Sequence, residues 1–273
     1  MSRRTQVTIG GSAIQGAGGV AISSDGQVIN TSPGNGSVDL WSVMSDGSGQ
    51  KQLTKNTGKY NSTYQFTSDG SYFIFNSIRS GNNQVWRMNA DGSNPIQLSN
   101  TGQPAGGAEI SPDGKWVYFI ESPPGQSINQ VNKVSIEGGE SILADERNYA
   151  DLPRFSPDGK LLMFVGKDEN NAPLPTTVIE SATGKVICPA EKLLNAQYGI
   201  WAKDSRHLIY PKSLNQELWQ YDIFADKHEK IADFRPATIF PFAISPDGKK
   251  FVFSLGNISD ETILFTNYLS ETK

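Results

Sequence analysis

The chain has 273 residues, of which 37% are hydrophobic and 10% aromatic, so it can bury a core and is not expected to be disordered. Its formal charge of −4, from 24 basic and 28 acidic residues, comes without a basic run. This argues against a nucleic-acid surface, because phosphates require clustered lysine and arginine. No apolar run approaches the roughly 20 residues needed to span a bilayer, so direct membrane insertion is not expected.

The 27 glycines and 15 prolines are spread along the whole chain, and no stretch has the pattern of a long amphipathic helix. This composition favours an all-β fold. The single cysteine, Cys188, cannot form an internal disulfide, so stability must come from packing. The residues behind Met1–Arg4 lack the apolar segment of a signal peptide. We therefore expect either a cytoplasmic protein or a chain that begins part-way through a longer one.

The first predicted element is an isolated strand, Thr5–Thr8, and a recurring phrase follows it. The phrase has an apolar residue, a small residue, one further residue and Asp, followed by Gly in five copies. Its aspartates are Asp25, Asp69, Asp113, Asp158, Asp204 and Asp247, spaced by 44, 44, 45, 46 and 43 residues. Six copies at so even a spacing indicate a repeat architecture.

Each copy predicts four short strands in the same order. An apolar and a small residue end the first strand, as in Ile110–Ser111, and alternating apolar residues such as Trp116–Ile120 form the second. A polar loop leads to the third strand, as in Gln84–Met88, and a glycine turn leads to the fourth, as in Ile96–Leu98. Four antiparallel strands in a unit of this length match one β-propeller blade.

The two ends of the chain complement each other. The sixth copy stops after its third strand near Tyr268, and Thr5–Thr8 resembles the fourth strand of the first copy, Lys51–Thr54. We expect Gln6–Thr8 to pair with Thr262–Phe265 and to leave no open sheet edge there. The prediction is an all-β, six-bladed β-propeller of four-stranded antiparallel blades, one domain over residues 1–273, closed by the N-terminal strand.

The phrase Ser-Pro-Asp-Gly-Lys before alternating apolar residues resembles the repeat of TolB-like propellers, relatives of the WD-repeat class, over essentially the whole chain. The last copy, Phe240–Lys249 with Asp260–Phe265, looks more narrowly like the C-terminal propellers of some bacterial membrane-anchored serine/threonine kinases and CadC-like regulators. That resemblance implies a sensor or interaction module, extracytoplasmic (periplasmic) if the protein is membrane-anchored. The chain carries neither kinase nor helix-turn-helix motifs, so an effector domain would lie outside it.

Residues suited to catalysis are sparse. Of the two histidines, His207 is expected in the second strand of the fifth copy and His228 in a turn, where packing or surface roles are commoner than catalysis. Cys188 is expected in a fourth strand, and no HExxH, CxxC or GxSxG pattern occurs. We expect no enzyme activity, no metal and no cofactor from this chain. A propeller lyase or hydrolase is the enzymatic alternative.

Residues of the repeat itself have structural interpretations. The aspartates resemble calcium ligands in type, but an Asp before Gly between two strands is typical of a turn, where the carboxylate accepts backbone N–H groups. Trp41, Trp86 and Trp219 recur in third strands and are expected in the core between blades.

Comparison of the copies separates scaffold from binding surface. The loops between second and third strands differ in length and chemistry: they are Asn76–Asn83, Glu121–Asn129, Gly166–Pro175 and Pro211–Gln216. The turns of the opposite rim are uniform. Because loops on a rigid scaffold commonly carry function, the variable rim is the predicted binding face.

The first strand of each copy should border the central channel. Two residues before the small residue of the phrase, three neighbouring copies carry Gln65, Glu109 and Arg154. Polar groups and aromatic rings at a channel mouth suit a small polar ligand or a peptide end. The alternative is that Glu109 and Arg154 only pair with each other and with water. The predicted ligand-binding residues are Tyr60, Gln65, Glu109, Tyr149, Asp151, Arg154 and Tyr198.

The functional prediction is a non-catalytic binding or sensor propeller that recognises a protein partner or a small polar ligand at the channel mouth. It would be monomeric as an isolated domain and part of a larger bacterial signalling protein. A TolB-like periplasmic scaffold that docks a partner protein is the main alternative. A kinase or winged-helix domain upstream would favour the sensor, whereas a signal peptide and an extra N-terminal domain would favour the scaffold.

Overall fold

The computed structural model describes residues 3–6, 19–34, 37–55, 61–121, 124–125, 129–145, 151, 153–168, 170, 172, 174, 176–188, 199–212, 215–256 and 260–266. Over these residues the regular elements are all β-strands, arranged in six four-stranded antiparallel sheets. Within the same part of the chain, no helix is long and apolar enough to cross a membrane. We number the sheets in chain order of their innermost strands.

The first five sheets each use four consecutive strands, and the sixth borrows one from the N-terminus. The first holds β2 (Val20–Ile22), β3 (Gln27–Gly34), β4 (Ser37–Met44) and β5 (Lys51–Gln52); the second β6 (Asn61–Phe66), β7 (Tyr72–Ser77), β8 (Gln84–Asn89) and β9 (Ile96–Gln97); the third β10 (Ala105–Ile110), β11 (Trp116–Glu121), β12 (Gln130–Ser135) and β13 (Ile142–Asp145). The fourth holds β14 (Arg154–Phe155), β15 (Leu161–Phe164), β16 (Thr177–Glu180) and β17 (Val186–Cys188); the fifth β18 (Ile200–Trp201), β19 (His207–Lys212), β20 (Glu217–Asp222) and β21 (Lys227–Asp233); the sixth β22 (Thr238–Ile244), β23 (Lys250–Gly256), β24 (Asp260–Thr266) and β1 (Arg3–Gln6). The predicted all-β propeller of four-stranded antiparallel blades is confirmed.

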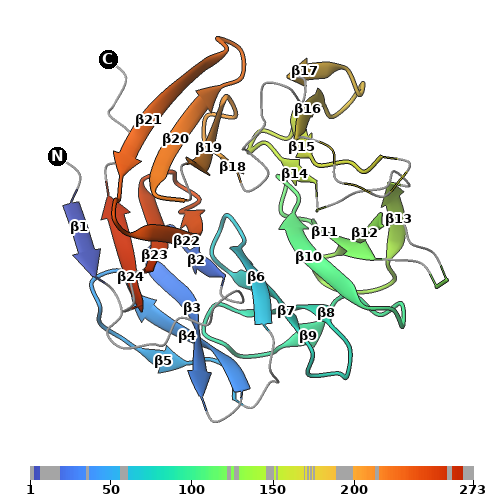
Figure 1. Cartoon of the computed structure of the whole chain (residues 1–273). Coiled ribbons are helices and arrows are strands. Elements are labelled where there is room, and N and C mark those ends of the chain that lie inside the picture. The colour runs from blue at the N-terminus through green and yellow to red at the C-terminus, as the bar shows by residue number, and fades with distance from the viewer. Residues whose placement is uncertain are drawn as a thin grey trace.

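The sheets stand around a common centre, with their innermost strands nearest to it (Figure 1). Each sheet contacts the next, and the sixth contacts the first. The contacts are Gln27 Nε2 to Ala90 O, Ile110 N to Gln65 Oε1, the rings of Tyr118 and Phe155, Trp201 Nε1 to Arg154 O, Lys203 Nζ to Pro246 O, and Lys250 Nζ to Ser24 O. Polar and aromatic contacts therefore join the sheets in a cycle.

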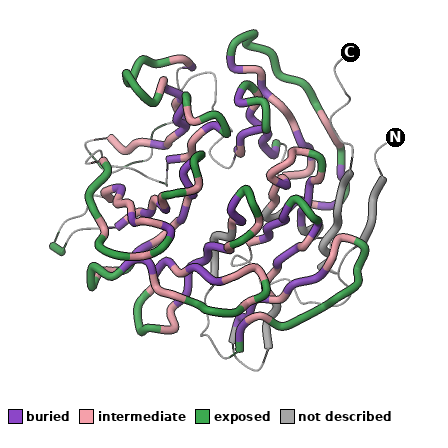
Figure 2. Tube along the Cα trace, turned by 180° about the vertical axis from the view of Figure 1, so that it is seen from behind, coloured by how far each residue is buried: buried purple, intermediate pink, exposed green. Residues whose placement is uncertain are grey.

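The core lies between sheets. On β11 the exposure alternates along the strand, and Val117 and Phe119 on its inner face are fully buried. Every apolar cluster combines residues of two neighbouring sheets, and one of them packs Val252 of β23 against Val20 and Val28 of the first sheet. Figure 2 shows buried segments along the inner strands and exposed ones at turns and along β21. Packing between sheets, as the single cysteine implied, stabilises the fold.

Two of the three repeated tryptophans behave as expected. Trp86 and Trp219 are half-buried and pack against clusters that join two sheets. Trp41 on β4 is also half-buried but lies outside those clusters.

The repeat turn has the same shape in several copies because of its serine and aspartate. In the third copy, Ser111 Oγ donates to Asp113 Oδ1 at 2.5 Å and accepts from Trp116 N at 2.9 Å, while Asp113 accepts Lys115 N at 3.1 Å. Gly114 then adopts a φ of +72°, a value that glycine reaches without strain. The aspartates therefore form turns, as predicted.

In the fifth copy, different residues form the equivalent turn. Ala202 replaces the serine, so Asp204 accepts the backbone N–H of His207 directly, at 3.0 Å. Ser205 takes the glycine position with a φ of +57°, and its Oγ accepts Asp158 N of the fourth sheet at 3.0 Å. The missing glycine is thus offset by a bond between sheets.

The N-terminal strand completes the sixth sheet as predicted, but it begins earlier in the chain than expected. β1 covers Arg3–Gln6 and pairs with β24 from Arg3 opposite Thr266 to Gln6 opposite Ile263. Val7 and Thr8 lie outside the described residues. The observed strand begins two residues before the expected one. The pair of Gln6 with Ile263 falls inside the expected pairing of Gln6–Thr8 with Thr262–Phe265, so the pairing of the N-terminal strand with the last strand of the chain is confirmed at this residue.

The prediction for His228 was wrong. His228 was expected in a turn but lies on β21, because the turn ends at Asp226, which has a φ of +54°. The imidazole stacks on the ring of Tyr221, with 4.3 Å between centroids, and its Nδ1 lies 2.7 Å from the hydroxyl oxygen of Tyr210. His207 and Cys188 lie on β19 and β17, the second and fourth strands where they were expected.

Candidate functional site

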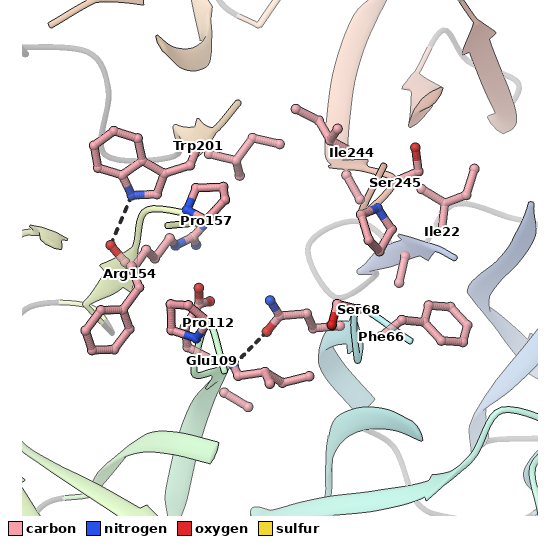
Figure 3. Close-up of a pocket in the computed structure, with 18 of the residues that line it drawn as sticks. Ile22, Phe66, Ser68, Glu109, Pro112, Arg154, Pro157, Trp201, Ile244 and Ser245 are labelled. Carbon is pink, nitrogen blue, oxygen red and sulfur yellow. Dashed lines mark hydrogen bonds between the residues drawn. The ribbon is translucent and has the colours of Figure 1, made fainter. Parts of the chain in front are cut away.

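A central channel of about 590 Å³ is lined by the innermost strands of all six sheets. Figure 3 shows side chains from several sheets around one open space, with Glu109 and Arg154 on one side of it and Ile22 and Ile244 on the other. Most of the wall is apolar, including Phe66 and Trp201. A mostly apolar cavity with a few convergent polar groups is the usual form of a small-ligand site.

Four of the predicted site residues line this channel: Gln65, Glu109, Asp151 and Arg154. The other three, Tyr60, Tyr149 and Tyr198, lie outside the described residues, and their place at the mouth stays a prediction. The loops that follow the second strands of the third, fourth and fifth sheets are also only partly described. The structure therefore brings together the four predicted site residues that line the channel.

Irregular pairing of the inner strands places the first two polar side chains. The register of β6 against β7 shifts between Ser62 and Gln65, and that of β10 against β11 shifts between Gly106 and Glu109. Such bulges re-aim the side chain that follows them. In β10 the shift includes Gly107, whose φ of +62° favours glycine.

Gln65 is tied to the neighbouring sheet by one end of its amide. Its Oε1 accepts the backbone N–H of Ile110 at 2.9 Å. Its Nε2 donates to no group in the described part of the chain. One donor therefore remains available at the channel wall.

Arg154 is anchored through its backbone rather than through its guanidinium. Its carbonyl oxygen accepts Trp201 Nε1 at 3.1 Å, the bond drawn in Figure 3. Among the described residues, the guanidinium makes a single long hydrogen bond, from Nη1 to Gly199 O at 3.4 Å. Since a guanidinium has five N–H donors in a planar fork, most of its capacity is left for another acceptor.

Burial raises the pKa of Glu109 to about 7. The positive charge of Arg154 opposes this rise, whereas the negative charge of Asp151 adds to it. Within the described residues, no direct ion pair joins Glu109 to Arg154. The simpler interpretation, in which the two side chains neutralise each other by direct contact, is therefore not what the structure shows.

The comparisons with known proteins agree with the architecture. The family model described as "TolB beta propeller domain" matches residues 5–192, more than half of the chain. The chain belongs to this family. The TolB-type fold is shared with TolB of Acinetobacter baumannii at a TM-score of 0.61, with 14% identity over 92% of this chain and 79% of that one.

This TolB-type propeller is also similar to one further solved structure and to one curated protein. A gluconolactonase of Xanthomonas campestris superimposes with a TM-score of 0.65 and 13% identity, over 97% of this chain and 89% of that one. An uncharacterized protein of Agrobacterium fabrum is 29% identical over 130 residues, which are 47% of this chain and 43% of that protein. The chain thus matches less than half the length of this curated relative. Identities of 13–14% between this chain and the two solved structures establish the shared fold alone.

The sequence interpretation of this TolB-type propeller missed one charged residue of the channel. Lys203 lines the channel, and its Nζ donates to Pro246 O of the sixth sheet at 2.9 Å. It replaces the serine or proline that precedes Asp in the other copies, so the irregular fifth copy carried the signal. Its ammonium group bridges two sheets and adds positive charge to the channel wall.

Proposed function

We propose that the chain is a non-catalytic binding propeller whose central channel takes a small polar ligand, with Arg154 holding an anionic group of that ligand. The supporting observation is the guanidinium of Arg154, which lines the channel with most of its donors unused by the described residues. Guanidinium groups bind carboxylate and phosphate oxygens through two parallel hydrogen bonds, which makes this residue suited to the role.

We further propose that the six sheets are the blades of one closed six-bladed ring. Contacts join each sheet to the next, and Val252 of the sixth sheet packs against Val20 and Val28 of the first. Pairing of β1 with β24 supplies a fourth strand to the sixth sheet. A closed ring keeps Gln65, Glu109 and Arg154 at fixed positions on the channel wall.

The wider context is part of the same proposal. We infer that this propeller is the sensor or interaction part of a larger bacterial signalling protein. One observation supports this: the last copy, Phe240–Lys249 with Asp260–Phe265, resembles kinase-linked propellers. The full-length reading frame tests it, because an upstream kinase or winged-helix domain is expected.

The binding function is tested by a thermal-shift screen of small polar metabolites and peptides on the wild-type chain and on Arg154→Ala. We expect at least one anionic compound to raise the melting temperature of the wild type and not that of the variant. Arg206→Ala is the matched control, because Arg206 is an arginine outside the channel that pairs with Asp222. Hits that survive Arg154→Ala unchanged would move the site away from the channel.

Two other functions have a specific observation in their favour. A scaffold that docks a partner protein is supported by the shared fold of TolB. A lyase or hydrolase is supported by the gluconolactonase fold and by Glu109, whose pKa of about 7 suits a general base. Turnover of a lactone that disappears in Glu109→Gln would favour the enzyme over the binding module.

A further inference from the structure

Charges of both signs meet at one place on the channel wall. Arg154 of β14 supplies a guanidinium, and Glu109 of β10 and Asp151, three residues before Arg154, supply carboxyl groups. These groups are close enough for Arg154 and Asp151 to shift the pKa of Glu109. Gln65 adds an amide nitrogen that donates to no described residue.

This mixture discriminates against ligands with a single charge. An anion on Arg154 is repelled by Asp151 and by the ionised form of Glu109, and a cation beside Glu109 is repelled by Arg154. A ligand with one charge would therefore gain from one partner and lose to the other.

A ligand whose two charges are a few atoms apart avoids this loss. In a free α-amino acid one carbon separates the carboxylate from the ammonium group, whereas each end of a peptide carries only one of them. Most of the remaining channel wall is apolar, with Phe66, Ile110 and Trp201 among its residues. Such walls favour an apolar side chain on the ligand.

We infer that the channel binds a free α-amino acid with an apolar side chain, its carboxylate on Arg154 and its ammonium group on Glu109. This inference rests on the proposed binding function and narrows it to one class of ligand. Gln65 Nε2 is placed on the same wall and supplies a further donor for the ligand carboxylate.

Proton release on binding is an expected consequence. Without ligand, Glu109 has a pKa of about 7, with Arg154 and Asp151 as the charged groups that act on it. A bound ammonium group favours the carboxylate form, so the complex should hold fewer protons than the free protein near neutral pH. Affinity should therefore rise as the pH increases from below 7 to above it.

The test is isothermal titration calorimetry on the 273-residue chain with three probes that share the leucine side chain: L-leucine, which has both charges, N-acetyl-L-leucine, which lacks the ammonium group, and L-leucinamide, which lacks the carboxylate. We expect L-leucine to bind, and each of the other two to bind about ten- to a hundredfold more weakly, the usual effect of losing a charged hydrogen-bonded group. Titration at pH 7 in buffers of different ionisation enthalpy should show proton release.

Variants assign each charge to its partner. Arg154→Ala should lose L-leucine, and Arg154→Gln serves if the alanine variant does not fold. Glu109→Gln should weaken L-leucine and remove the preference for it over N-acetyl-L-leucine. Glu229→Gln, an exposed glutamate on β21, is the matched control and should bind as the wild type does.

The outcomes separate this inference from the broader function. Equal binding of L-leucine and N-acetyl-L-leucine to the wild type would overturn the recognition of an amino acid, whereas loss of both in Arg154→Ala would keep the channel as a binding site. Absence of L-leucine binding at millimolar concentration would overturn the inference as well. The metabolite screen would then decide the binding function by itself.

Discussion

Replacing Ser156 by alanine tests whether the serine of each repeat holds its turn together. Ser156 is fully buried, and its Oγ accepts the backbone N–H of Leu161 at 2.9 Å while donating to Asp158 Oδ1 at 2.7 Å. Alanine would remove both bonds and leave a buried N–H of Leu161 without its acceptor. A lost hydrogen bond with an unsatisfied buried partner costs about 1–3 kcal/mol, so the free energy of unfolding should fall by about 2 kcal/mol.

The expected change in melting temperature follows from the size of the chain. Unfolding entropies of about 2.1 cal/mol/K per residue give a chain of 273 residues a loss of about 2 °C for each kcal/mol. Ser156→Ala should therefore melt about 4 °C below the wild type in differential scanning calorimetry. Ser181→Ala is the control, because Ser181 is an exposed serine of the same sheet whose Oγ donates to Gly159 O. That variant should melt within about 1 °C of the wild type.

The fifth copy defines the result that would refute this reasoning. There Ala202 stands in place of the serine, and Asp204 accepts the N–H of His207 at 3.0 Å. If Ser156→Ala melted with the Ser181→Ala control, Asp158 would have replaced the serine as acceptor in the same way. The serine would then not be required for the turn.

Three further predictions concern the ends of the chain, its response to acid and its charge. Deletion of residues 1–6 should unpair β24 and lower the melting temperature, whereas deletion of residues 1–2 should not; equal melting of the two truncations would contradict the role of β1. Hydrogen bonds from Thr67 and Ser111 lower the pKa of Asp69 and Asp113, so the stability they contribute is present above the pKa of an unfolded Asp, about 3.9, and is lost as the pH falls through the lower folded value. Thermal melting followed by circular dichroism should therefore give a lower melting temperature at pH 2 than at pH 7, and equal melting temperatures at the two pH values would refute this. With a formal charge of −4, the chain should give no salt-dependent shift of DNA in a gel, and micromolar binding that weakens steeply with salt would overturn that expectation.

The blades could be predicted from the sequence because the repeat turn is local. In five of the six phrases a serine or threonine hydroxyl, together with the aspartate, bonds to groups within five residues, so their spacing determines the turn and fixes the flanking strands. The apolar run at Trp116–Ile120 predicted a strand that is either half-buried or buried, and β11 is a strand along which burial alternates. The pairing of β1 with β24 could be predicted because the last copy lacks a fourth strand, whereas the start of β1 at Arg3 was not predicted.

The site could be predicted only as a set of residues. Equivalent positions in the copies indicated Gln65, Glu109 and Arg154, because the first strand of each blade faces the channel. The raised pKa of Glu109 could not be predicted, since it arises from burial among strands far apart in sequence. The unused donors of Arg154 were equally hidden, because a sequence does not show which acceptors a guanidinium reaches.

A crystal structure of the chain soaked with the strongest hit of the thermal-shift screen tests the central claim most directly. We expect electron density inside the channel, with an anionic group of the ligand within hydrogen-bond distance of the Arg154 guanidinium. Density for the same compound on the outer strands or on the rim of uniform turns, with the channel filled by solvent alone, would contradict the assignment of the channel as the binding site.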